Sequence, residues 1–257
     1  MKVVIAGFGP FPGAPSNPSG RLATALARRR RPALAAIEIT SHIFATAYEA
    51  VDRDLPKLLA RKPDVLLICG LASRRREICI ETRARNARSI LFPDVSGYRP
   101  KHGAIESGRA GALVGNAPFP RLLNALRQTG LPARFSRDAG AYLCNYAYWR
   151  ALRATRGGRP LVQFVHIPRI SAMRRPRKLP RPRAPPFSRL VTACEGLLLT
   201  LIAASRQSNQ SPTAARPLSV SARPQNRSNC AMSARRNATA PRALSRRAAK
   251  IARSWRP

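Results

Sequence analysis

A cysteine and a histidine are the residues of this sequence best placed to do chemistry. Cys144 lies in the first turns of a helix that we expect over residues 139–153, after a strand that ends near Ser136. A helix N-terminus favours the thiolate, which is the nucleophilic form of cysteine. His166 lies near the end of an apolar strand expected over residues 161–167, and α/β active sites gather at the carboxyl ends of strands. Each residue alone is more often structural, but the pair fits a nucleophile and its base.

Two other segments carry groups that would complete such a site. The segment 77–82 ends in Glu81 and Thr82. A buried carboxylate here could orient an imidazole, whereas a glutamate between apolar residues usually lies on the exposed face of a strand. Phe8 and Phe11 lie in a loop of glycines and prolines directly after the first apolar segment. Their rings suit a flat, apolar ligand or the core equally.

The same glycine-rich loop must be tested as a dinucleotide site. Its glycines are spaced Gly-x-Gly-x-x-x-Gly over residues 7–13, which is not the dinucleotide spacing. Pro10 and Pro12 also remove backbone N–H groups that would bind a pyrophosphate. The loop therefore argues against NAD binding.

The order of the expected elements predicts an α/β fold with a largely parallel sheet. Strands are expected over residues 1–6, 35–41, 64–69 and 133–136, an extended segment over 77–86, and helices over 19–30, 47–61, 119–129 and 187–205. Long loops are expected over residues 92–111 and 173–186. Ser19 is a candidate N-cap for the first helix, and Pro56 a candidate break or kink in the second.

The composition limits which cellular compartments and which classes of protein fit this sequence. The chain has 257 residues, 44% of them hydrophobic, and a formal net charge of +36. Such a charge first suggests a polyanion-binding protein, but a basic patch requires clustering that sequence does not show. Its five cysteines are odd in number and contain no Cys-x-x-Cys pair, which argues against disulfides and zinc. With no targeting signal and no apolar run of about 18 residues, we expect a cytoplasmic protein outside the membrane.

Composition also divides the chain into two parts. Residues 207–257 contain no Asp or Glu, have 11 Lys and Arg, and are otherwise rich in Ser, Asn, Ala and Pro. Such a segment cannot bury enough apolar surface to offset its ordering entropy. We therefore predict a domain over residues 1–206 and a disordered basic tail over residues 207–257.

Taken together, the motifs resemble the pyroglutamyl peptidase I (pyrrolidone-carboxylate peptidase) family of cysteine peptidases. Three ordered segments carry the resemblance: Gly7-Phe8-Gly9-Pro10-Phe11-Pro12-Gly13 followed by Asn17-Pro18-Ser19, then Ser136 with Ala139-Gly140-Ala141-Tyr142-Leu143-Cys144-Asn145, then Phe164-Val165-His166-Ile167-Pro168. The match extends over residues 1–206, and the Ala-Gly-x-Tyr-Leu-Cys-Asn stretch is specific.

The resemblance implies a fold, a reaction and a set of site residues. It implies a three-layer α/β/α domain with a twisted open sheet, often tetrameric, that needs no metal or organic cofactor. It implies that Cys144 is the nucleophile, His166 the base and Glu81 the carboxylate of a triad. Phe8, Phe11 and Tyr142 would form the pocket for the lactam ring. The substrates would be small peptides with an N-terminal pyroglutamate.

The sequence departs from the family pattern in three places and leaves alternatives open. The departures are Ser73-Arg74-Arg75-Arg76 in place of a Gly-Gly-Arg run, Thr82 after the acid, and Leu91 at an arginine position. One alternative is a catalytically weak or inactive homologue that binds RNA or another polyanion. Another is a thiol hydrolase with a different substrate. The tail would be an extension or a frameshift product, and its contact with polyanions would be non-specific.

Overall fold

The computed structural model describes residues 1–11, 13–108, 111–155, 158–170 and 185–210. These residues belong to one compact unit, Met1–Pro212. The remaining unit, Thr213–Pro257, lies outside the described residues, as do most of the loop predicted over residues 173–186 and the predicted disordered tail beyond Gln210.

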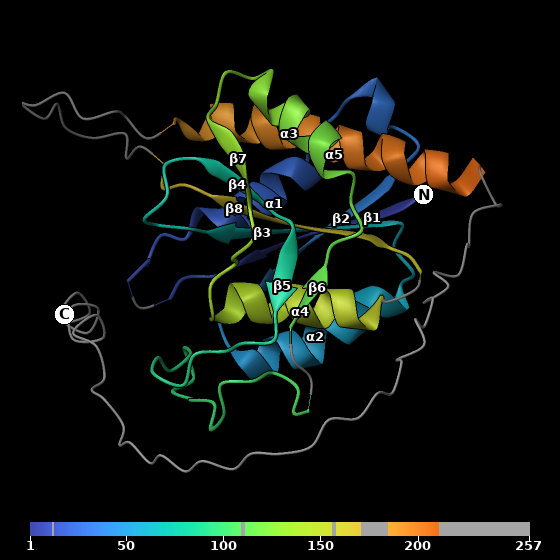
Figure 1. Cartoon of the computed structure of the whole chain (residues 1–257). Helices are drawn as coiled ribbons and strands as arrows, with labels where there is room; N and C mark the ends of the chain where they lie inside the picture. Colours follow the sequence, from blue (N-terminus) through green and yellow to red (C-terminus); the bar gives the residue numbers. More distant parts are fainter. Residues whose placement is uncertain (12, 109–110, 156–157, 171–184, 211–257) are drawn as a thin grey trace, which may run out of the picture. The chain divides into compact units, whose positions relative to one another are not determined.

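A six-stranded sheet forms the centre of the described unit, in the order β2-β1-β3-β8-β4-β7 (Figure 1). Its strands are β1 (Lys2–Phe8), β2 (Glu38–Phe44), β3 (Val65–Leu71), β4 (Ile78–Glu81), β7 (Ala133–Ser136) and β8 (Leu161–Ile167). Neighbours run parallel except β4 and β8, which are antiparallel. The expected α/β fold with a mostly parallel sheet is therefore confirmed, and β4 supplies the one reversal among these pairs. A separate antiparallel pair joins β5 (Arg83–Arg85) to β6 (Ala112–Val114).

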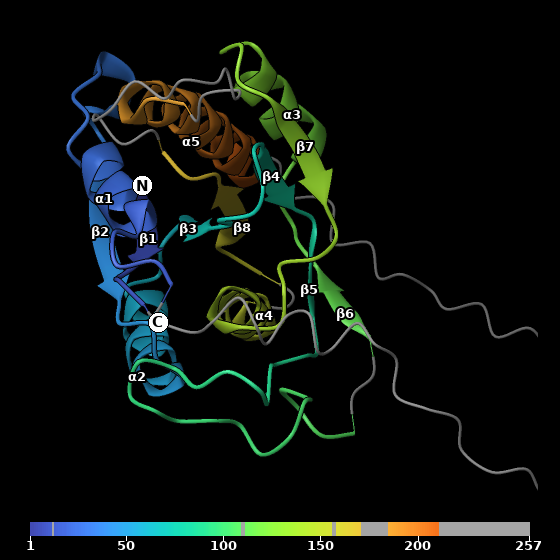
Figure 2. The same cartoon turned by 90° about the vertical axis from the view of Figure 1, so that its left-hand side faces the viewer.

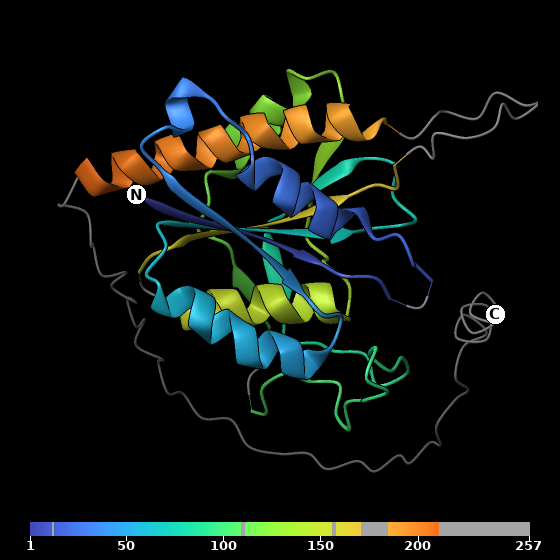
Figure 3. The same cartoon turned by 180° about the vertical axis from the view of Figure 1, so that it is seen from behind.

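Helices cover both faces of the sheet (Figures 2 and 3). One face carries α1 (Pro18–Ala27), α3 (Phe119–Arg127) and α5 (Phe187–Gln210), and the other carries α2 (Tyr48–Ala60) and α4 (Leu143–Ala154). A short 3₁₀ helix, η1 (Pro32–Leu34), precedes β2. The three-layer arrangement implied by the resemblance is thus present.

The sheet separates two hydrophobic clusters, and β1 contributes to both. Val3 and Ile5 pack into the cluster beneath α1, α3 and α5, whereas Val4 and Phe8 pack into the cluster beneath α2 and α4. Successive side chains of a strand point to opposite faces. A strand buried on both faces therefore shows the continuous apolar run seen at the start of this sequence.

Three local expectations differ from the structure. The N-cap of α1 is Asn17, whose side chain accepts a hydrogen bond from the backbone of Ser19, so Ser19 is not the cap. Pro56 is exposed within α2 and the helix continues to Ala60, since Leu55 and Leu58 remain buried on its inner face. The helix predicted over 139–153 begins only at Leu143.

The last helix runs further than expected. The prediction ended it at residue 205, but α5 continues to Gln210, four residues into the predicted tail. Over Phe187–Ser208 it is long and apolar enough to cross a membrane by length and composition, with a mean hydropathy of 1.5. A core helix passes the same test, and 56% of the most apolar window is buried inside the domain.

Candidate active site

Cys144 is held at the first turn of α4, above the sheet. The helix begins at Leu143 with Tyr142 in the N-cap position, so Cys144 is its second residue. Its side chain is partly buried over β3, where an added Cβ on Gly70 would lie 2.9 Å from the Cys144 Sγ. The glycine at this position therefore leaves the space that the thiol occupies.

His166 and Glu81 are brought together by the antiparallel pairing of β4 with β8. Cys79 lies opposite His166 in this pairing, and Glu81 lies opposite Phe164. Residues two apart on a strand share a face, so Glu81 is the diagonal neighbour of His166. The Nδ1 of His166 lies 2.8 Å from Oε1 of Glu81, and the two residues are only 5% and 0% exposed.

One cavity of about 170 Å³ brings five of the six predicted site residues together. Its lining includes Phe8, Phe11, Tyr142, Cys144 and His166. Glu81 is not in the lining and reaches the cavity only through His166. Two larger cavities, of about 480 and 430 Å³, are lined by none of these residues. Cavity size alone therefore does not identify the site.

The aromatic residues of the cavity differ in how they are held. Phe8 is 2% exposed and packs against Phe44 and Phe164, so it is both core and cavity wall. Phe11 is only partly buried. Tyr142 donates a hydrogen bond from its hydroxyl to the carbonyl of Pro93, which ties the loop over residues 89–98 to the cavity.

Burial and charge act differently on the thiol and the carboxyl. Burial raises the pKa of Cys144 to about 12, with a further contribution from the negative charge of Glu81. Burial also opposes ionisation of Glu81, but the hydrogen bond and charge of His166, with help from Ser136 and Arg75, lower the pKa of the carboxyl below its usual value. A neutral thiol therefore lines the same cavity as an imidazole that is held by an ionised carboxylate.

Sequence reasoning missed several residues that hold the site. Asn17 and Thr46 each donate a side-chain hydrogen bond to the carbonyl of Gly9, at 2.9 and 3.1 Å, and so fix the loop between the two phenylalanines. The buried side-chain amide of Asn145 accepts a hydrogen bond from the backbone N–H of Arg85. It also donates hydrogen bonds to the carbonyls of Arg85 and Ala87. Polar residues within an otherwise apolar motif were the only signal of these roles.

The three departures from the family pattern lie in different surroundings. Leu91 is 69% exposed. Thr82 bonds the carbonyl of Ser136 through both its backbone and its hydroxyl, and so extends the pairing of β4 with β7. Arg75 from the Ser73–Arg76 run reaches Glu81, with 2.8 Å between Nη1 and Oε1.

Comparison with known proteins identifies the family. The family model described as pyroglutamyl peptidase matches residues 1–207, which is nearly the whole described unit. The chain belongs to the pyroglutamyl peptidase family. It is 34% identical over 182 residues to a pyrrolidone-carboxylate peptidase of Thermococcus onnurineus, covering 69% of this chain and 89% of the relative. It is also 34% identical over 173 residues to the pyrrolidone-carboxylate peptidase of Pyrococcus furiosus, covering 66% and 82%.

Solved structures of pyroglutamyl peptidases share the fold. The pyrrolidone carboxyl peptidase from Thermococcus litoralis superposes with a TM-score of 0.70 at 26% identity, covering 80% of this chain and 96% of that one. Pyroglutamyl peptidase I of Bacillus amyloliquefaciens gives a TM-score of 0.66 at 26% identity, covering 79% and 98%. This chain is therefore a peptidase of the pyroglutamyl peptidase family, with an α/β domain like those of its relatives.

Proposed function

We propose that the chain hydrolyses the bond after an N-terminal pyroglutamyl residue, with Cys144 as nucleophile, His166 as general base and Glu81 as the group that orients His166. The observation that carries the proposal is the 2.8 Å contact between His166 Nδ1 and Glu81 Oε1 at a cavity that Cys144 also lines. Family membership supports the reaction type.

In this mechanism the thiol loses its proton during attack. Because burial keeps the pKa of Cys144 high, the resting nucleophile is a thiol, so His166 takes the proton as the sulfur bonds to the scissile carbonyl carbon. The resulting imidazolium is stabilised by Glu81. His166 then protonates the departing amine, which leaves a thioester on Cys144. A water molecule, deprotonated by His166, hydrolyses the thioester and releases pyroglutamate.

The start of α4 would stabilise the negative oxygen that forms during attack. The first backbone N–H groups of a helix have no partner within the helix. Cys144 is the second residue of α4, so such groups would lie near the carbon that its sulfur attacks. Donors fixed in this way act most strongly where charge develops in the transition state.

The cavity explains why a lactam would be selected over an ordinary N-terminus. At about 170 Å³ it is below the usual size of a site for a drug-sized ligand, and suits one small ring. Phe8, Phe11 and Tyr142 would hold the uncharged lactam. A free ammonium in the same place would lose its hydration without a charged partner, at a cost of several kcal/mol.

A fluorogenic pyroglutamyl amide tests the proposal directly. The full chain should release the fluorophore, and a thiol-alkylating agent should stop the release with the label found on Cys144. Cys144→Ala should abolish turnover, whereas Cys194→Ala, at a buried thiol in the other hydrophobic cluster, should retain it. Unchanged turnover by Cys144→Ala would refute the assignment.

The tetrameric state expected from the family resemblance stays a prediction. If the protein is a tetramer, size-exclusion chromatography with light scattering should give four times the mass of the chain. The mass of a single chain would contradict the tetramer. Cytoplasmic location and contact of the basic tail with polyanions also stay predictions.

A further inference from the structure

Arg75 connects two parts of the site that are far apart in the chain. Its Nη1 donates to Oε1 of Glu81 at 2.8 Å and to Oγ of Ser136 at 3.1 Å. Its Nη2 donates to the carbonyl of Asp138 at 2.8 Å. One guanidinium thus binds the carboxylate beside His166 and also the loop that leads to Cys144.

The contact with Glu81 matters because Arg75 reaches the same carboxylate oxygen that His166 contacts. The Oε1 of Glu81 lies 2.8 Å from both Arg75 Nη1 and His166 Nδ1. Its buried Oε2 has no hydrogen-bond partner among the described residues. Arginine stays charged at every working pH, unlike histidine. Arg75 therefore keeps a full positive charge in direct contact with the buried carboxylate.

The contact with Asp138 matters because the next residues set the position of the nucleophile. Gly140 has a φ of +83°, which favours glycine, and its N–H donates to the Asp138 carboxylate at 3.0 Å. Arg85 bonds the Gly140 carbonyl and pairs with the Asp138 carboxylate. Arg75 and Ser136 both contact Asp138 and Glu81, and Arg75 is the charged member of this pair.

We infer that Arg75 is a positioning residue of the reaction: it keeps Glu81 ionised and aligned on His166 while fixing the loop before Cys144. The inference rests on the proposed function. It also gives a role to one residue of the Ser73–Arg76 run, to which the sequence alone assigned none.

A pH profile is the readout that separates this role from a structural one. The titratable or polar groups that face Glu81 are His166 and Gln163 from β8, Arg75 from the β3–β4 loop, Cys144 and Tyr148 from α4, and Ser136 from β7. Loss of Arg75 removes one contribution that lowers the pKa of Glu81. The acid limb of kcat/KM should then move to higher pH, because Glu81 protonates earlier.

The experiment compares three variants of the full chain. Arg75→Gln should lower kcat by about 100-fold with little change in KM, as misplacement of a reacting group does. Arg75→Lys should restore the acid limb but only part of kcat, because one ammonium cannot span both Glu81 and Asp138. Arg76→Gln removes the same charge from an exposed neighbour and should match the wild type.

Controls keep this result distinct from failure of the proposed function. Circular dichroism and thermal unfolding test whether each variant folds. If Arg75→Gln does not fold, Arg75→Lys becomes the deciding variant, and a wild-type kcat in it would overturn the inference. A kcat and acid limb in Arg75→Gln equal to those of Arg76→Gln also overturn it. If the wild type does not cleave pyroglutamyl amides, the proposed function fails, and the pH profile of Cys144 alkylation replaces turnover. That profile should be displaced in Arg75→Gln only, and coincident profiles would refute the role.

Discussion

At the scale of single residues, the site combines a thiol that burial keeps neutral with a carboxylate that its neighbours keep ionised. The pKa of Cys144 is raised to about 12 by burial, while contacts with His166 lower that of Glu81 against the effect of its own burial. The difference favours proton transfer during attack over a preformed thiolate. Glu81→Gln, which keeps the shape of the side chain but not its charge, should therefore leave only partial activity.

Phe8 and Phe11 should separate stability from binding. Phe8 is buried in the core, so Phe8→Ala should lower the free energy of unfolding by about 3–5 kcal/mol. Phe11 is only partly buried and lines the cavity, so Phe11→Ala should raise KM with a small change in stability. Denaturant unfolding and steady-state kinetics on both variants test the contrast. An unchanged KM in Phe11→Ala would remove that residue from the pocket.

Two buried carboxylates should make the fold sensitive to acid. The pKa values of Glu81 and Glu195 are lowered in the folded state, although burial by itself would raise both. The contact with His166 outweighs burial for Glu81. The contacts with Arg31 and Arg29 outweigh burial for Glu195. Groups with lowered pKa values stabilise the fold above the unfolded pKa, near 4.5. That stabilisation is lost as pH falls through the lower folded pKa.

Thermal unfolding between pH 6 and pH 3 measures this loss. Glu195→Gln should reduce the fall in Tm with acidification, because the group responsible for part of it is gone. Glu195 lies on α5, which covers the face of the sheet opposite to α4 and Cys144, so this variant should retain turnover. An identical fall in Tm for wild type and Glu195→Gln would contradict the expectation.

At the scale of elements, β3 shapes the site through the absence of a side chain. A Cβ on Gly70 would lie 2.7 Å from Cζ of Phe164 and 2.9 Å from Sγ of Cys144. Both distances are too short, so the ring or the thiol must move. The parallel register also places Gly70 beside His166. A strand that supplies none of the proposed catalytic groups therefore borders both Cys144 and His166.

Gly70→Ala should consequently lower kcat/KM by about 100-fold, since it displaces the nucleophile. The matched control is Gly196→Ala in α5, where an added Cβ would meet its nearest atom, the carbonyl oxygen of Ala125, at 3.9 Å. That substitution should stabilise the helix by about 0.5–1 kcal/mol without changing turnover. Equal kinetics for the two variants would show that Cys144 tolerates the intrusion.

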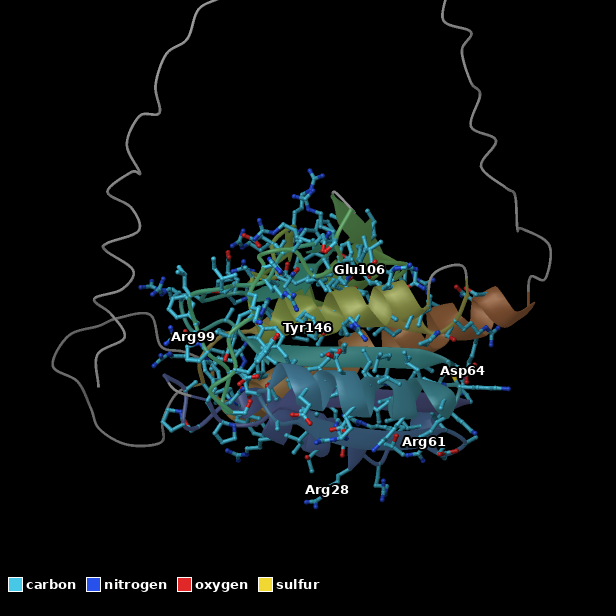
Figure 4. The ribbon with its side chains drawn as sticks, turned by 90° about the horizontal axis from the view of Figure 1, so that it is seen from below. Arg28, Arg61, Asp64, Arg99, Glu106 and Tyr146 are labelled. Carbon is cyan, nitrogen blue, oxygen red and sulfur yellow. The ribbon has the colours of Figure 1, made fainter. Side chains whose placement is uncertain are left out.

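At the scale of the whole molecule, charge is spread over the domain as well as the tail. Figure 4 views the side of α2 and α4, where Tyr146 lies between these helices and labelled arginines such as Arg61 and Arg99 extend from the periphery. Tyr146 donates to the carboxylate of Asp52 at 2.8 Å, which joins α4 to α2. Charged residues of both signs, including Asp64 and Glu106, therefore lie around a packed helix pair on this face.

Truncation after Pro212 should distinguish an enzyme from a polyanion-binding protein. It follows the boundary between the two units and removes all 11 Lys and Arg of the tail. Turnover and Tm should be unchanged, while any affinity for RNA should fall and depend less steeply on salt. Loss of turnover in the truncated chain would show that the tail contributes to the active domain.

Local sequence patterns are sufficient to predict the fold class, because apolar strands and amphipathic helices alternate along the chain. They also indicate which cysteine and histidine to consider, since each lies near the boundary of such an element. The boundaries themselves were less certain: α4 begins at Leu143 because the preceding residues form a loop with Gly140 at positive φ, which the helical spacing does not reveal.

The surroundings of those residues depend on how the strands and loops assemble. The reversal of β4 makes Glu81 a diagonal neighbour of His166, and strand direction is not encoded in an alternating pattern. The long-range reach of Arg75 to Glu81 and to Asp138 likewise depends on how the loops after β3 and β7 meet. Local sequence specifies elements through backbone preference and hydrophobic period, whereas contacts across about 60 residues exist only once the sheet is assembled.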